Sequence, residues 1–138
     1  MVNEMVDWEA FYNEGRSYHR TAQGSVRRPE VFTPGIIQNL VAMGIEKYIM
    51  ALFMKRGMLP RNHTMTDLLE ESDGMLPLGA NTKETLLYMD GLQRICSMDD
   101  FSIQEPTKED VTRFLAAIDA VASAVETELH EGTPAEVK

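Results

Sequence analysis

The chain is poor in cysteine, with Cys96 as the only one among its 138 residues. A lone cysteine excludes an intramolecular disulfide, and no group of Cys and His has the spacing of a zinc site. Apolar runs are also short, since the longest, YIMALFM at 48–54, falls well below the ~20 residues that span a bilayer. Residues 1–13 lack the apolar core of a signal peptide. We therefore expect a cytoplasmic protein without a membrane segment.

Positive charge is scarce in the last third of the chain. Residues 90–138 contain 4 Lys and Arg against 11 Asp and Glu, whereas residues 1–89 contain 9 and 11. This acidic end would repel a phosphate backbone, so extended nucleic-acid binding is not expected. A small basic cluster remains near the N-terminus: Arg16, Arg20, Arg27 and Arg28. We interpret the cluster as a solvated surface that balances nearby acids.

No segment alternates between apolar and polar residues as a strand would, and the apolar residues follow the helical period instead. The predicted helices cover about 6–23, 33–57 and 64–73, and two more begin near Asn81 and Thr107. The sequence therefore predicts an all-α protein, an up-and-down four-helix bundle with an extra short helix. We expect one domain over residues 6–129 and a flexible tail at 130–138.

The segment 33–57 is the most apolar of these helices, and its apolar residues cover two faces. Thr33 suits its N-cap, and Gly57 can adopt the left-handed conformation that ends a helix. Thr64 and Thr107 each precede an aspartate by three positions, the spacing of a capping box. We expect the segment to be central and contacted on several sides. Because its apolar faces exceed what one core readily buries, we also expect a homodimer.

Four segments carry a resemblance to a known family: FYNEGRSYHRTA, NLVAMGIEKYIMALFMKRG, the LPRNHTMTDLL turn and PTKEDVTRFLAAIDAV. Their order and spacing, over about residues 6–129, resemble the HEPN domain family of helical bundles. The resemblance implies a homodimeric binding or accessory module that works with a nucleotidyltransferase or another nucleotide-handling partner. A nucleotide is the implied ligand. Many relatives carry Arg-Tyr-Pro before the final helix, where this chain has MDDFSIQEP.

Some members of the HEPN family are metal-independent ribonucleases that use an arginine followed, after four to six residues, by a histidine. Arg56 and His63 have this spacing and form the candidate catalytic pair of an alternative function, a toxin-type endoribonuclease. The intervening residues include Gly57 and Pro60, which end one helix before Thr64 begins the next. We therefore predict a helix exit and entry here, with Arg56 extending into water. A structural homodimer without a ligand is the third alternative.

Polar residues on otherwise apolar helices suggest a small cleft. The candidate cleft residues are Arg16, His19, Arg20, Asn39, Glu46, His63 and Asp67. Asn39 and Glu46 lie two turns apart on one face, and a buried Glu46 needs a base from the first helix, either as a structural ion pair or as the floor of a cleft. His63 and Asp67 are too few for a metal site and lack a nucleophile. With no glycine-rich phosphate loop either, we predict no metal and no cofactor.

Overall fold

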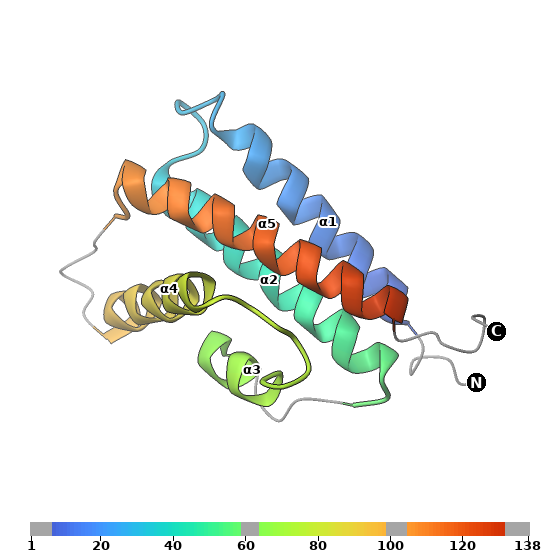
Figure 1. Cartoon of the computed structure of the whole chain (residues 1–138). Helices are drawn as coiled ribbons and strands as arrows, with labels where there is room; N and C mark the ends of the chain where they lie inside the picture. Colours follow the sequence, from blue (N-terminus) through green and yellow to red (C-terminus); the bar gives the residue numbers. More distant parts are fainter. Residues whose placement is uncertain (1–6, 59–63, 99–104, 132–138) are drawn as a thin grey trace.

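The computed structural model describes residues 7–58, 64–98 and 105–131, and within these ranges every regular element is a helix. The elements are α1 (Trp8–Ser25), α2 (Pro34–Lys55), α3 (Met65–Glu71), α4 (Ala80–Met98) and α5 (Lys108–Glu131) (Figure 1). The prediction of an all-α protein is thus confirmed. His63 and Pro60 lie outside the described residues, as do the start of the predicted domain at residue 6 and residues 132–138 of the predicted tail.

Four helix boundaries are where the local signals predict them, and the start of α3 is one of these, because Thr64 is its N-cap. The hydroxyl of Thr33 accepts a hydrogen bond from the backbone N–H of Ile36 at 3.2 Å, which caps α2. Gly57 follows α2 with φ of 72°, the left-handed conformation that glycine adopts without steric cost. Before α5, Thr107 and Asp110 form a reciprocal capping box, with each side chain accepting from the other residue's backbone N–H at 3.0 Å.

Several boundaries differ from the prediction by one or two residues: α1 ends at Ser25 rather than 23, and α3 at Glu71 rather than 73. α4 begins at Ala80, ahead of the predicted start at Asn81, because the carbonyl of Gly79 already accepts from the backbone N–H of Lys83 at 3.0 Å. α5 runs to Glu131, so His130 and Glu131, which were predicted to belong to the tail, are part of the helix. In the last two cases the helix extends past the residue that carries the sequence signal, as frayed helix ends commonly do.

α2 is the central helix of the bundle, as expected. It contacts α1, α3 and α5. Its buried residues are Ile37, Gln38, Val41, Gly44, Ile45, Tyr48, Ile49, Met50, Ala51, Leu52 and Phe53. By length and composition α2 is the one described helix that could cross a membrane, yet 61% of its most apolar window is buried inside the fold. This degree of burial is typical of a helix at the core of a bundle.

The direction of each helix decides which ends meet. α1 runs antiparallel to α2, so Trp8 at the start of α1 lies beside Lys55 at the end of α2. α5 runs in the same direction as α2, and Arg56 just after α2 donates to Glu128 near the end of α5. The start of α1 and the ends of α2 and α5 therefore come together at one end of the molecule (Figure 1).

α4 and α3 cover the rest of the core. α4 packs antiparallel on α5, where Tyr88 donates to Asp110 at 3.1 Å and Arg113 donates to Thr85 at 3.3 Å. α3 contacts both α4 and α2. Apolar side chains from all these helices form one core, and α5 contributes its fully buried Phe114.

Candidate functional site

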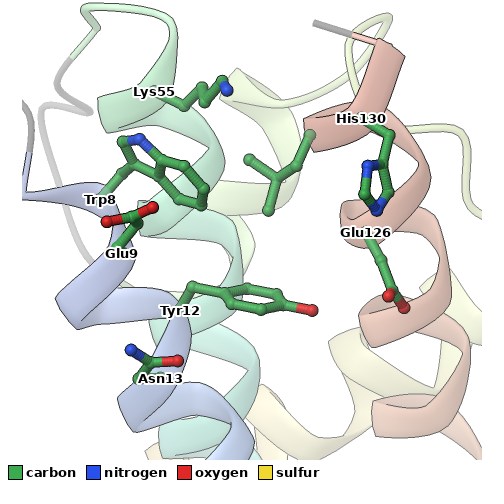
Figure 2. Close-up of a pocket in the computed structure, with 8 residues that line it drawn as sticks. Trp8, Glu9, Tyr12, Asn13, Lys55, Glu126 and His130 are labelled. Carbon is green, nitrogen blue, oxygen red and sulfur yellow. The ribbon is translucent and has the colours of Figure 1, made fainter. Parts of the chain in front are cut away.

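A cavity of about 460 Å3 opens where the start of α1 meets the ends of α2 and α5. It is lined by Trp8, Glu9, Tyr12, Asn13, Lys55, Glu126, Leu129 and His130. Figure 2 shows the ring of Tyr12 extending from α1 toward α5, and the ring of His130 facing it from α5. The cavity therefore combines aromatic surfaces with both acidic and basic side chains.

The aromatic wall follows from the helical spacing of α1. Trp8 and Tyr12 are four residues apart and share a face, with ring centroids 6.4 Å apart at an angle of 58°. The antiparallel packing of α2 then places the ammonium of Lys55 over the indole of Trp8, 4.7 Å from the ring centroid. This distance is that of a cation–π contact. A cation of the protein itself therefore already lies on one aromatic face of the cavity.

The hydroxyl of Tyr12 lies in a partly buried and negatively charged environment. Burial raises the pKa of Tyr12, the nearby charge of Glu126 raises it further, and Arg16 partly offsets this effect. Both upward effects disfavour the phenolate, so this hydroxyl remains protonated at neutral pH. Tyr12 can donate a hydrogen bond into the cavity but is poorly suited to act as a base.

A polar network joins the same three helices and runs from the buried Tyr48 to the exposed Asp119. The imidazole of His19 contacts the hydroxyl of Tyr48 through Nδ1 at 2.9 Å and the carboxylate of Asp119 through Nε2 at 2.7 Å. Because a carboxylate only accepts, Nε2 of a neutral His19 carries the hydrogen, and Nδ1 accepts from Tyr48. Gln23 also donates to Asp119, at 2.6 Å. The network ties α1 to α2 and α5.

Tyr48 is too enclosed to be a reactive group. Only 2% of the residue is exposed. Burial raises the pKa of Tyr48 to about 12, with smaller upward contributions from Tyr12, Glu126 and Asp119. The arrangement of Asp119, His19 and Tyr48 resembles a proton relay but ends on a hydroxyl that no substrate reaches. We therefore assign it a structural role.

The cavity lies apart from the candidate residues of the predicted cleft, and His63 is outside the described residues. None of the described candidates lines the cavity, and Arg16, Arg20 and Asn39 are exposed. Glu46 is half-buried on α2. His19 is not its predicted base, because both ring nitrogens of His19 already contact Tyr48 and Asp119. Of the two candidates on α2, Asn39 therefore faces solvent, whereas Glu46 is partly covered.

Arg56 is exposed and is also held in an ion pair, which the sequence did not predict. Its guanidinium donates to Glu128 of α5 at 2.8 Å, and the Glu128 side chain is only 18% exposed. Asp67 serves the start of α3, since its backbone N–H donates to the hydroxyl of Thr64 at 3.1 Å and its carboxylate accepts from that hydroxyl at 2.8 Å. Of the proposed catalytic pair, only Arg56 lies within the described residues, and its guanidinium is bound to Glu128.

Among the described ranges, no three His, Cys, Asp or Glu side chains are grouped so that they could hold a metal ion. Comparison of the chain with protein-family models, with curated proteins and with solved structures yields no match.

Sequence reasoning missed the cavity residues, although part of the signal was present. The four-residue spacing of Trp8 and Tyr12 places them on one face of the first helix, and the same spacing of Glu126 and His130 places them on one face of the last. What joins the two faces is the direction of α1 relative to α5, which no local pattern of residues specifies.

Proposed function

We propose that the chain is a small HEPN-like module, an up-and-down four-helix bundle that acts in the cytoplasm by binding rather than by catalysis. The observation that carries this proposal is the cavity at the meeting point of α1, α2 and α5. Its volume of about 460 Å3 lies within the range of ~300–1,000 Å3 typical of small-molecule sites. Aromatic surfaces with a few polar groups from three helices are also typical of such sites.

The chemistry of the lining favours binding. It includes no Ser, Thr or Cys that could act as a nucleophile. The alternative endoribonuclease requires Arg56 to contact phosphate, but Arg56 would first have to leave Glu128. We therefore expect the purified protein to leave single-stranded RNA intact. RNA cleavage that is lost in folded Arg56→Ala and His63→Ala variants would refute this reading.

The cavity contains its own reporter, because Trp8 is the only tryptophan of the chain. In protein labelled with 15N, the indole N–H of Trp8 gives a single side-chain signal from this site. We expect some members of a panel of small amines, neutral aromatic compounds, carboxylates and nucleotides to shift that signal in a saturable way. If no member shifts it at millimolar concentration, the binding role is wrong and the structural alternative without a ligand is favoured.

Homodimerisation is part of the proposal. On α2, Ile36 is 42% exposed and Met43 is 41% exposed, and the half-buried Leu40 lies between them. Because residues seven apart share a face of a helix, these side chains form one apolar strip at the surface. Light scattering coupled to gel filtration tests the prediction, and a mass near that of one chain at micromolar concentration would contradict it.

The protein partner is proposed from the resemblance alone. A HEPN-like module of this size would act beside a nucleotidyltransferase or another nucleotide-handling protein. If a nucleotidyltransferase encoded beside this chain co-purifies with it after co-expression, the proposal is supported. If the two proteins purify separately, the proposal is contradicted.

A further inference from the structure

The charges around the cavity indicate which class of ligand it accepts. This inference rests on the proposed binding role and names the ligand. Two carboxylates, Glu9 and Glu126, line the cavity together with one lysine, Lys55. These three side chains together carry a formal charge of −1. The whole chain has a formal net charge of −9, so the wider field has the same sign.

The two carboxylates of the cavity differ from neighbouring acids in their partners. Glu128, two positions from Glu126, is paired with Arg56, and Glu14 on α1 is paired with Lys47 at 2.9 Å. Within the part of the chain that the structure describes, neither Glu9 nor Glu126 has an ion-pair partner. The acids beside the cavity are neutralised internally, whereas those that line it remain available to a ligand.

The aromatic surfaces favour the same sign of charge. The faces of Trp and Tyr rings attract cations, and Lys55 over Trp8 demonstrates this attraction within the site itself. Tyr12 presents a second ring beside Glu126 (Figure 2). The effect of Glu126 on the pKa of Tyr12 indicates that the carboxylate acts on this ring's hydroxyl. Leu129 adds an apolar surface for the carbon part of a ligand.

We propose that the cavity binds a small organic cation, a ring or alkyl group bearing one ammonium or guanidinium group. The carbon part contacts Trp8, Tyr12 and Leu129, and the cationic group lies between the ring of Tyr12 and the carboxylate of Glu126. A phosphate group in the same place would face two carboxylates with only Lys55 to oppose them. The lining therefore disfavours a nucleotide in this cavity.

Three compounds that share a phenyl ring and differ in charge test the proposal: 2-phenylethylamine, 2-phenylethanol and 3-phenylpropionate. Each is titrated into the full chain at neutral pH while the fluorescence of Trp8 is recorded. We expect the amine to bind about tenfold more tightly than the carboxylate, with the alcohol between them, and added salt to weaken only the amine. Equal affinities, or a preference for the carboxylate, would overturn the proposal.

A matched pair of variants locates the charge. Glu126→Gln should weaken binding of the amine about threefold to tenfold and leave the alcohol unchanged. Glu109→Gln removes the same charge from an exposed position on α5, about 25 Å from Glu126 along the helix. This control variant should leave the affinities for both the amine and the alcohol unchanged. Equal effects of the two variants would mean that only the overall field acts, which would also overturn the proposed site.

Failure of the ligand class is distinguishable from failure of the binding role. If other members of the panel shift the Trp8 indole signal but none of the cations does, the cavity binds ligands and the proposed class is wrong. If no compound shifts the signal, the binding role itself fails, and the inference fails with it.

Discussion

Replacing Gly44 by alanine should destabilise the fold because α1 and α5 both pack closely against α2 at this residue. A Cβ added at Gly44 would lie 2.8 Å from Cδ1 of Ile118 and 3.2 Å from Cβ of Tyr18. Carbon atoms in good contact are ~3.5–4.0 Å apart. Across the same contact, a Cβ at Gly15 would lie 3.0 Å from Cδ1 of Tyr48 and 3.3 Å from the carbonyl oxygen of Gly44.

Two effects of opposite sign determine the magnitude. Alanine in place of glycine inside a helix gains ~1 kcal/mol from helix propensity. Overpacking a filled core costs ~1–3 kcal/mol. The added methyl group cannot easily be accommodated, because Ile118 is fully buried and Cβ of Tyr18 moves only with the backbone of α1. We expect a net loss of up to ~2 kcal/mol in the free energy of unfolding.

Gly91→Ala is the matched control. Gly91 lies inside α4, where an added Cβ meets nothing within 4 Å, so this variant should gain ~0.5–1 kcal/mol. Urea unfolding followed by circular dichroism measures both variants against the parent protein. If Gly44→Ala is as stable as Gly91→Ala, the close approach of α1 and α5 to α2 is not as described here. Gly44→Val, which adds more volume, should be worse than Gly44→Ala.

Three further predictions concern single interactions. The pKa of Tyr48 is raised from 10.0 to about 12, so its stabilising contribution is present below pH 10 and is lost as the pH rises through 12. Urea unfolding should show a loss of at most about 3 kcal/mol in the free energy of unfolding over this interval, and a smaller loss in Tyr48→Phe. Arg56→Ala should lower the free energy of unfolding by ~1–2 kcal/mol by leaving Glu128 unpaired, whereas no coupling in a double-mutant cycle with Glu128→Gln would refute the pair. Thr107→Ala should lower the melting temperature through the loss of ~1 kcal/mol of capping energy, and an unchanged value would show that the capping box contributes nothing.

The helices could be predicted because their signals are local. Thr33 and Thr107 cap α2 and α5 through residues within three positions, and Gly57 ends α2 through its own φ. The start of α4 was misplaced because Asn81 has the side chain of a good N-cap, while the helix begins earlier with only backbone bonds. A residue that is able to cap a helix is not always the residue that begins it.

The cavity could not be predicted because its parts are far apart in the sequence. Trp8 and Glu126 meet only because α1 runs opposite to α5, and Lys55 joins them only because α2 ends at the same place. The candidate cleft residues were instead inferred from polar positions that have apolar neighbours along the same helix. Asn39 is polar because that edge of α2 faces solvent, which a single helix cannot reveal.

Two links between the helices of the bundle do not involve the carboxylates that are proposed to bind. Arg56 and Glu128 join α2 to α5, and His19 joins α1 to both through Tyr48 and Asp119. The carboxylates of the cavity take part in neither interaction. It follows that a conservative change such as Glu126→Gln should alter ligand affinity at little cost in stability, because it leaves these two interhelical links intact. This separation allows the binding proposal to be tested on folded protein.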